Sequence, residues 1–277
     1  MSSFEIAFIG GGNMARALIG GLVRQGTPAS AIRVGEPSAA VRSGLERDFG
    51  CRTSPDNPVA AAAADAVVLA VKPQEAAAVV SALAPELRAE RPLFISVAAG
   101  IGVRSLESWC GPGVPIVRAM PNRPALVGAG ATGLYAGTGV PAAGRALAER
   151  ILQSVGSLVW VESEDDLDVV TALSGSGPAY CFLLAEAMMN AAVKLGLDPR
   201  AARTLAVETL HGAGALAHAG SADLARLRAE VPSKGGTTEA ALRVLEGEHG
   251  LAGLVERAMS AAAQRSRELS RQFGADG

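Results

Sequence analysis

Three consecutive glycines interrupt an apolar stretch near the start of the chain, in the sequence IAFIGGGNMARALIGGL. A glycine turn between a strand and a helix can bind phosphate, because the backbone comes close and the first N–H groups of the helix are free. In the pattern G-x-G-x-x-G/A, Gly10 permits the tight turn and Gly12 the close approach to a pyrophosphate, while Ala15 lets the helix pack on the sheet. The spacing therefore predicts phosphate-binding chemistry.

An acidic residue follows where such a site requires one. Glu36 lies about twenty residues beyond Ala15, where a carboxylate accepts hydrogen bonds from an adenosine ribose. Strand, helix and acid together predict dinucleotide binding. The alternative is a plain turn with Glu36 on a solvated loop. A carboxylate at this position repels a 2′-phosphate and favours NAD, whereas Ser38 and Arg42 nearby weaken that preference.

Small or polar residues also follow three later apolar stretches, in the segments 70–73, 97–100 and 120–122. In an open α/β sheet, ligands lie outside the carboxyl ends of the strands. These segments are therefore candidates for lining the nicotinamide half of a cofactor. Ordinary turn chemistry of Pro and Gly is the alternative.

Two further clusters precede apolar helices in the second half of the chain, at 174–178 and at 233–238. Each offers hydroxyls, backbone N–H groups and a helix N-terminus, which suit a small carboxylate. The alternative at the second cluster is helix capping by Thr237 or Thr238.

The elements that would position these residues alternate between strand and helix up to about residue 165. Such alternation predicts an α/β domain with a parallel, doubly wound sheet covered on both faces. Ser38 is expected to cap a helix ending at Phe49. The predicted strands are 4–9, 32–36, 66–71, 93–97 and 116–120, with edge strands at 131–135 and 158–161 around a helix over 142–155.

Beyond residue 165 only helices are expected, over 178–195, 199–217, 222–230 and 251–273. We therefore expect a dinucleotide-binding Rossmann domain at 1–164 and a helical dimerisation and substrate domain at 165–277. Asp198 and Pro199 form a cap followed by Pro at the first helical position. The helical half is short and rich in apolar faces, which predicts burial against a second copy in a homodimer.

Composition excludes several classes of function. The 277 residues carry a net charge of −2, 49% hydrophobic residues, two Trp and two Tyr. A basic stripe for nucleic acid is missing. We expect no membrane span, since no apolar run approaches ~20 residues, and no signal peptide, since the start MSSFEIAF carries no positively charged region. The three cysteines, none in a CxxC pair, indicate a reducing cytoplasm. The histidines lack the partners for a metal site.

Together, these clusters resemble the pyrroline-5-carboxylate reductase family over residues 4 to 272. The matching segments occur in the family's order: FIGGGNM, AVKPQ, SVAAGI, RAMPN, LSGSGPAY and GGTT. The resemblance implies an enzyme that reduces 1-pyrroline-5-carboxylate to L-proline with NADPH or NADH, the last step of proline biosynthesis. It also implies a cytoplasmic homodimer, which in this family commonly assembles into a decamer.

The resemblance implies roles for individual residues. The Ser233–Thr238 loop is expected to hold the substrate carboxylate with help from the dimer partner, through Ser233, Gly236 and Thr237, while the Thr238 hydroxyl is expected to bond the ring nitrogen as the catalytic group. The cofactor is expected to contact Ile9, Gly10, Gly11, Gly12, Asn13, Met14, Glu36, Asn57, Ala70, Val71, Lys72, Pro73, Ala98 and Ala99.

The chain departs from the family pattern at Arg123, where Thr is usual, and in the substrate loop at Arg228, Ala229 and Lys234. Two other functions stay open from the residues. One is a related imine, β-hydroxyacid or keto-acid reductase, which would use a helical lysine such as Lys194. The other is a protein that binds the dinucleotide without turnover.

Overall fold

A computed structural model describes residues 4–220 and 223–274. The chain divides into two compact units. The first, here called the N-terminal unit, comprises Met1–Gly175 and Ala262–Gly277; the second, the helical unit, is Ser176–Ala261. The predicted domain boundary between residues 164 and 165 stays a prediction.

The N-terminal unit is built on one eight-stranded sheet in the order β3-β2-β1-β4-β5-β6-β7-β8. Strands β1 to β6 run parallel, β7 runs antiparallel to β6, and β8 runs parallel to β7. The strands are β1 (Ile6–Ile9), β2 (Ile32–Gly35), β3 (Arg52–Ser54), β4 (Ala66–Leu69), β5 (Leu93–Ser96), β6 (Ile116–Met120), β7 (Gly130–Ala136) and β8 (Gly156–Trp160).

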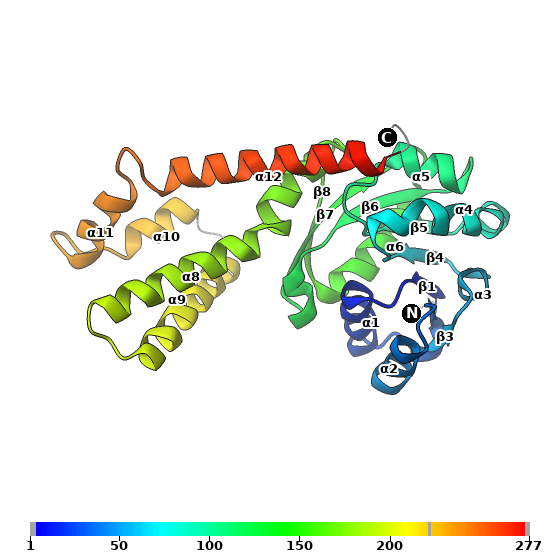
Figure 1. The fold of residues 1–277 in the computed structure, drawn as a ribbon, viewed down its shortest axis with the longest axis horizontal. Helices are drawn as coiled ribbons and strands as arrows, with labels where there is room; N and C mark the ends of the chain where they lie inside the picture. The colour runs from blue at the N-terminus through cyan, green and yellow to red at the C-terminus, as the bar shows by residue number, and fades with distance from the viewer. Residues whose placement is uncertain (1–3, 221–222, 275–277) are drawn as a thin grey trace. The chain divides into compact units, whose positions relative to one another are not determined.

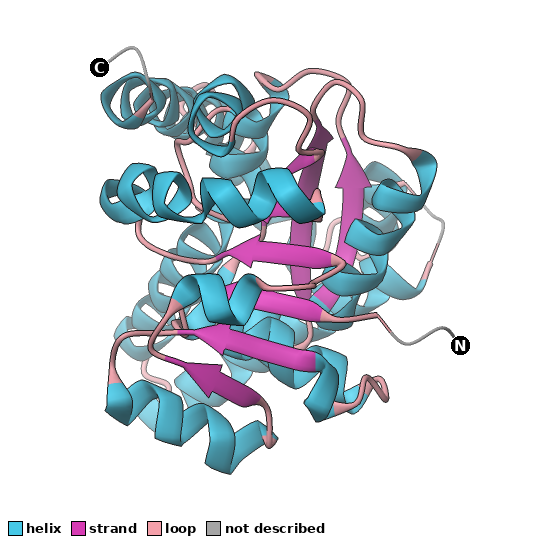
Figure 2. Ribbon diagram, turned by 90° about the vertical axis from the view of Figure 1, so that its right-hand side faces the viewer, coloured by secondary structure: helices cyan, strands magenta, loops and turns pink. Residues whose placement is uncertain are grey.

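Helices cover both faces of this sheet, as Figure 2 shows. The α-helices are α1 (Asn13–Arg24), α2 (Ala39–Phe49), α3 (Asn57–Ala61), α4 (Pro73–Glu90), α5 (Val103–Cys110), α6 (Ala142–Leu152) and α7 (Asp166–Val170). Short 3₁₀ turns lie at Ala29–Ala31, Arg123–Val127 and Gln153–Val155, and a π turn lies at Thr171–Gly175.

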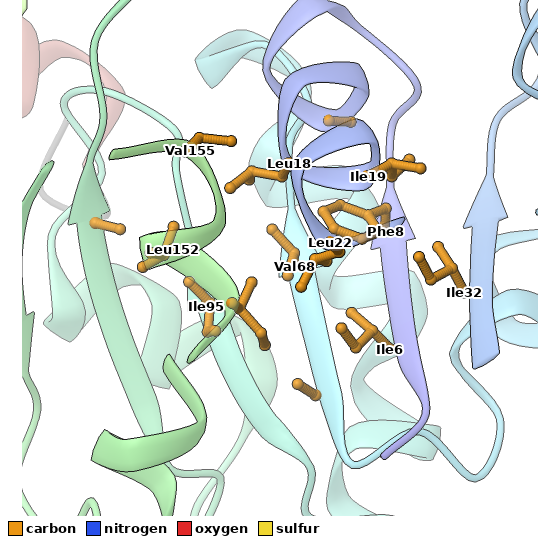
Figure 3. Close-up of a cluster of buried hydrophobic side chains, with 14 of the residues drawn as sticks. Ile6, Phe8, Leu18, Ile19, Leu22, Ile32, Val68, Ile95, Leu152 and Val155 are labelled. Carbon is orange, nitrogen blue, oxygen red and sulfur yellow. The ribbon is translucent and has the colours of Figure 1, made fainter. Parts of the chain in front are cut away.

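Alternating side chains of the buried strands form a core on each face. Ile6 and Phe8 of β1 pack with Leu18 and Leu22 of α1 (Figure 3), and the intervening residues of β1 face the core that contains α4 and α5. The side chains of Ile6, Phe8, Leu18 and Leu22 are each at most 1% exposed. Complete burial of such a side chain stabilises the fold by about 1.5–3 kcal/mol, which fixes the strand ends that carry the glycine turn.

The predicted fold class is confirmed, and three local features differ from the prediction. Neither β3 nor α3 was expected, because Arg52–Ser54 is polar and carries no apolar signal. The antiparallel direction of β7 was also missed. A parallel connection needs a crossover of about a dozen residues or more, whereas a single 3₁₀ turn, Arg123–Val127, joins β6 to β7.

The helical unit contains no strand among its described residues. Its helices are α8 (Gly177–Lys194), α9 (Pro199–Ala219), α10 (Leu224–Glu230), α11 (Thr237–Leu245) and the first part of α12 (Leu251–Phe273), whose end belongs to the N-terminal unit. Helices α8 and α9 lie side by side (Figure 1). The Asp198 side chain caps α9 as predicted, accepting from the N–H groups of Arg200 and Ala201. The predicted start of α10 at Ala222 lies outside the described residues.

Large apolar side chains of the helical unit are exposed in the single chain. Phe182 is 64% exposed, Leu183 66% and Val244 78%. Among the described residues, one helical run, Asp166–Lys194, is long and apolar enough to cross a membrane by length and composition alone. Sequence analysis had not found it. Length and composition do not by themselves identify a membrane span, because apolar core helices of soluble proteins pass the same test.

Candidate active site and cofactor groove

The glycine turn after β1 has the backbone geometry that only glycine adopts easily. Gly10 has a φ of +96°, and a Cβ atom there would lie 2.7 Å from the Ala70 carbonyl oxygen. The Gly10 N–H donates to the Gly35 carbonyl at 2.8 Å, which ties the turn to the end of β2. A Cβ atom at Gly12 would meet nothing within 4 Å. The turn is thus fixed on one side and open on the other.

Gly12 is the N-cap of α1 and makes no side-chain cap hydrogen bond. The first N–H groups of an α-helix have no partner within the helix, and its dipole places partial positive charge there. No acidic residue in the first turn of α1 neutralises this charge. The N-terminus of α1 can therefore receive the phosphates of a dinucleotide.

Glu36 lies just beyond β2, and its carboxylate is held by two backbone groups. One oxygen accepts from the Gly11 N–H at 2.9 Å and the other from the Ser38 N–H at 2.9 Å. Ser38 is the N-cap of α2 and accepts from the Val41 N–H, as predicted. The Arg42 guanidinium donates to the carbonyls of Glu36 and Pro37, both at 2.8 Å. The Glu36 carboxylate and the Arg42 guanidinium therefore both lie at the corner expected for the adenosine ribose.

The glycine turn and Glu36 line a groove of about 650 Å³ at the carboxyl ends of β1, β2 and β4. This volume suits a small-molecule or cofactor site. The lining residues are Gly10, Gly11, Gly12, Gly35, Glu36, Pro37, Asn57, Ala70, Val71, Lys72, Gln74, Glu75, Ala78 and Val79.

The groove gathers the predicted cofactor residues of the glycine turn, of Glu36 and Asn57 and of the segment after β4. Other predicted contacts do not line it. Ile9 is fully buried in β1, and Asn13 and Met14 begin α1. Pro73 begins α4, and Ala98 and Ala99 lie in the loop after β5.

Sequence reasoning missed the part of the groove formed by α4, and also Gly35 and Pro37 beside Glu36. Gln74, Glu75, Ala78 and Val79 recur at helical spacing directly after Lys72 and Pro73. Residues three and four apart share one face of a helix. That periodicity was the signal that could have found them.

The Asn57 side chain supports the fit of a polar ligand to this groove. Its Oδ1 atom is buried and has no hydrogen-bond partner among the described residues. It packs against Gly35, where a Cβ atom would lie 2.4 Å from Oδ1. Leaving a buried polar atom unpaired costs about 1–3 kcal/mol. An unpaired amide oxygen in the lining of a groove that also contains free helix N–H groups fits the polar surface of a dinucleotide.

The predicted substrate loop belongs to the helical unit and precedes α11. Gly236 is the N-cap of α11, and no side chain caps this helix. The interpretation that Thr237 or Thr238 is the cap is therefore wrong, because both lie inside the helix. The Gly236 N–H donates to the Ser233 carbonyl at 2.9 Å.

Glu239 holds the other side of this turn. Its carboxylate accepts from the Gly235 N–H at 2.7 Å and from Arg243 at 3.0 Å. The Gly235 N–H, and then Arg243, lower the pKa of Glu239 below its usual value. Lys234, a departure from the family pattern, is exposed.

Three residues that the sequence singled out, Asn122, Arg123 and Lys194, do not line the groove. The Asn122 amide donates to the Ser174 carbonyl at 2.9 Å and accepts from the Ala131 N–H at 2.9 Å, so that it links the π turn at Thr171–Gly175 to the start of β7. Arg123 is exposed. Lys194, the candidate of the rival hydroxyacid mechanism, is exposed in the last turn of α8.

Neither the buried thiols of Cys51 and Cys110 nor the described metal-ligating side chains favour thiol or metal chemistry. Burial raises the pKa of the Cys110 thiol to about 12 and also raises that of Cys51. A thiol must be deprotonated to act as a nucleophile. Within residues 4–220 and 223–274, no group of three or more His, Cys, Asp or Glu side chains could hold a metal ion.

The fold and the groove define an NAD(P)-binding oxidoreductase with a Rossmann domain, and comparison with known proteins agrees. Residues 5–100 match a family described as NADP oxidoreductase, coenzyme F420-dependent, and residues 164–269 match the pyrroline-5-carboxylate reductase dimerisation family. The pyrroline-5-carboxylate reductase of Pseudomonas aeruginosa is 48% identical over 274 residues, which cover 99% of this chain and 100% of that protein.

Solved structures give the same result. A pyrroline-5-carboxylate reductase from Coxiella burnetii has a TM-score of 0.94 and 43% identity, with 97% of this chain and 99% of that chain covered. The Plasmodium falciparum pyrroline carboxylate reductase, with NADP bound, has a TM-score of 0.83 and 28% identity, with coverage of 98% and 99%. The chain belongs to the pyrroline-5-carboxylate reductase family.

The predictions of family, reductase function, enzyme class and cofactor are thereby confirmed. The chain is an NAD(P)H-dependent oxidoreductase of a soluble biosynthetic family, and its dimerisation domain implies a homo-oligomer.

Proposed function

We propose that the chain reduces 1-pyrroline-5-carboxylate to L-proline, with the groove holding NADPH or NADH and the Ser233–Thr238 loop holding the substrate. The observation that carries the proposal is the groove itself. An open glycine turn, a free helix N-terminus, a carboxylate at the ribose corner and an unpaired amide oxygen converge on one volume of about 650 Å³. Identity of 48% along the whole chain to a reductase of this name supports the substrate.

In the groove, the N–H groups at the start of α1 bind the phosphates and Glu36 accepts from the adenosine ribose. Ala70, Val71 and Lys72 line the groove next to the glycine turn. A bound reduced nicotinamide supplies the hydride. The predicted contacts of Asn13, Met14, Pro73, Ala98 and Ala99 remain part of this proposal.

The substrate is a cyclic imine with one carboxylate, and its protonated form is already electrophilic at the imine carbon, which becomes C5 of proline. The chain then mainly has to orient the ring and hold the carboxylate. Ser233, Gly236 and Thr237 offer hydroxyl and N–H donors for the carboxylate. The Thr238 hydroxyl, which makes no hydrogen bond among the described residues, orients or protonates the ring nitrogen. In the balanced reaction the imine carbon, C5 of the product proline, gains the hydride, and the nitrogen keeps one proton.

The working form in this proposal is a cytoplasmic homodimer, which assembles further into a decamer. The exposed apolar side chains of α8 and α9 support burial against a second copy, because soluble proteins rarely leave such patches open. Subunit contact also accounts for the apolar run Asp166–Lys194 without a membrane.

Replacing Thr238 tests the assigned chemistry. Thr238→Ala should lower kcat/KM for the imine by roughly tenfold or more, because a charge-assisted hydrogen bond contributes ~1.5–3 kcal/mol. Thr238→Ser keeps the hydroxyl and is the matched control. NADH and NADPH oxidation should be followed side by side.

Unchanged kinetics of Thr238→Ala would remove this residue from the mechanism. Loss of activity in Lys194→Ala, together with turnover of hydroxy or keto acids, would favour the rival reductase. Tight cofactor binding without oxidation in the presence of the imine would favour a protein that only binds dinucleotide.

A further inference from the structure

The loop between β5 and α5 lies on the side of the sheet toward which the second half of a dinucleotide extends. Glu36, beyond β2, places the adenosine half over β1 and β2. The other half then extends over β4 and β5. The β5 strand is hydrogen-bonded to β4, and the Val97 N–H at its end donates to the Leu69 carbonyl at 3.0 Å. The loop 97–102 therefore follows directly beside the groove wall at 70–72.

A carboxylate from a distant part of the chain holds the end of this loop. Gly102 is the N-cap of α5 and has no side chain to cap the helix. Instead, Glu164, between β8 and α7, accepts from the Val103 N–H at 2.6 Å. A Cβ atom at Gly102 would lie 3.5 Å from the same carboxylate oxygen. Glu164 thus does for α5 what a capping side chain normally does, and its charge suits the helix dipole.

Arg118 fixes the Glu164 carboxylate from the sheet. It lies in the middle of β6, paired in register with Ser96 of β5, and its side chain is only 13% exposed. Its guanidinium donates to the same Glu164 oxygen at 2.6 Å. Exposed ion pairs contribute little to the free energy of unfolding. This pair is largely shielded from solvent, and Arg118 is anchored on a central strand, so that the pair holds the Glu164 carboxylate in place.

Two further contacts hold the rest of the loop. The Ser96 hydroxyl accepts from the Ala98 N–H at 3.4 Å. Gly100 has a φ of +75° and lies against Leu269, which a Cβ atom at Gly100 would approach within 3.5 Å. The loop is thus held at its start and middle by neighbours, and at its end by the Glu164 carboxylate and by the buried side chains of Ile101 and Val103.

We infer that Glu164 and Arg118 are positioning residues that hold the loop 97–102 against the nicotinamide half of the cofactor. The inference rests on the proposed cofactor binding. Neither side chain touches the cofactor: Glu164 acts through the Val103 N–H, and Arg118 acts through Glu164. Their loss should weaken contacts to the nicotinamide half and leave the adenosine half unchanged.

Calorimetry on the full-length protein can separate the two halves. Wild type and Glu164→Ala are titrated with the reduced dinucleotide that binds wild type more tightly, and with its matching adenosine half, ADP or 2′-phospho-ADP, which lacks nicotinamide and the ribose attached to it. The Kd for the dinucleotide should rise about fivefold, since loss of a cap costs about 1 kcal/mol. The Kd for the adenosine half should stay within twofold. Arg118→Gln should show the same split.

Hydrogen exchange of the ligand-free protein gives a second readout. Amides 97–105 should exchange faster in Glu164→Ala, and Glu164→Gln, which keeps an acceptor oxygen, should restore most of the protection. Glu149→Ala is the matched control, because Glu149 accepts from the Trp160 ring N–H at 2.6 Å and so also links two elements of the same unit.

The possible outcomes separate a failure of this inference from a failure of the proposed function. Equal weakening of both ligands, or unchanged affinity and exchange in both Glu164→Ala and Arg118→Gln, overturns the inference. Wild type that binds neither nucleotide overturns the proposed function instead. If Glu164→Ala does not fold, the same split is sought in Arg118→Gln and Glu164→Gln.

Discussion

At the scale of single residues, the ribose corner combines a carboxylate and a guanidinium that act in opposite ways on a 2′-phosphate. Glu36 is tied to the N–H groups of Gly11 and Ser38, so it cannot turn away without leaving two donors unpaired. Arg42 is tied to backbone carbonyls beside it. Because the carboxylate is held directly at the glycine turn, we expect its repulsion to dominate, and NADH to be preferred.

Glu36→Gln tests this expectation. The amide keeps an acceptor oxygen and removes the charge that repels a 2′-phosphate. The ratio of kcat/KM for NADPH to that for NADH should rise about tenfold, which corresponds to about 1.4 kcal/mol. Glu75→Gln, which removes a charge from another wall of the groove, is the control. An unchanged ratio, or an equal shift in the control, would contradict the role given to Glu36.

At the scale of elements, the candidate site is built from turns whose strands and helices were largely predictable. Buried apolar runs such as Ala66–Leu69 identified the central strands, and Gly, Asp and Pro marked helix ends such as Gly196 and Asp198. The glycine fingerprint could be recognised in the sequence because each of its residues meets a local requirement of the backbone.

Other parts of the site were beyond local patterns. The β3 strand is polar, so no periodicity revealed it, and α3, which places Asn57, was missed with it. The bond from Glu164 to the start of α5 joins residues far apart in the chain, and no spacing rule connects them. Gly236 replaced the threonines as the cap of α11, because the chain enters that helix one residue earlier than the hydroxyl pattern suggested.

The turn before α11 depends on Glu239, whose removal is testable. Glu239→Ala frees the Gly235 N–H, so the loop should become less ordered and KM for the imine should rise several-fold, with kcat and cofactor Kd little changed. Because the folded-state pKa of Glu239 lies below its usual 4.5, this contribution is present above that pH and is lost as the pH falls through the lowered pKa. The effect should therefore be constant between pH 6 and 9.

Glu230→Ala is the matched control, since Glu230 forms an exposed pair with Arg226 on α10 in the same unit. If Glu239→Ala left KM for the imine unchanged, or if both variants raised it equally, the loop would not depend on Glu239.

At the scale of the whole molecule, one unit carries a complete core and the other does not. The N-terminal unit has buried clusters on both faces of its sheet, whereas α8, α10 and α11 bury no residue in the single chain. Family membership places the dimerisation region at 164–269, over these helices. We therefore expect the helical unit to complete its core by association with a second copy of the chain.

Phe182→Glu should disrupt that association. The Phe182 side chain is 64% exposed in the single chain, and a charge buried at a subunit contact is unfavourable. Sedimentation equilibrium should show a smaller assembly than wild type at micromolar concentration. Val127→Glu, at an 80% exposed apolar residue of the N-terminal unit, should keep the wild-type mass. The same mass for both variants and wild type would place the interface elsewhere.

The most direct test of the central claim follows the transferred hydrogen. Wild-type enzyme is incubated with 1-pyrroline-5-carboxylate and a reduced dinucleotide deuterated at nicotinamide C4, with each face labelled in a separate reaction. The account predicts that one of the two labels gives L-proline carrying a single deuterium at C5, in step with loss of absorbance at 340 nm. Proline without deuterium from either label, or no proline despite bound cofactor, would contradict it.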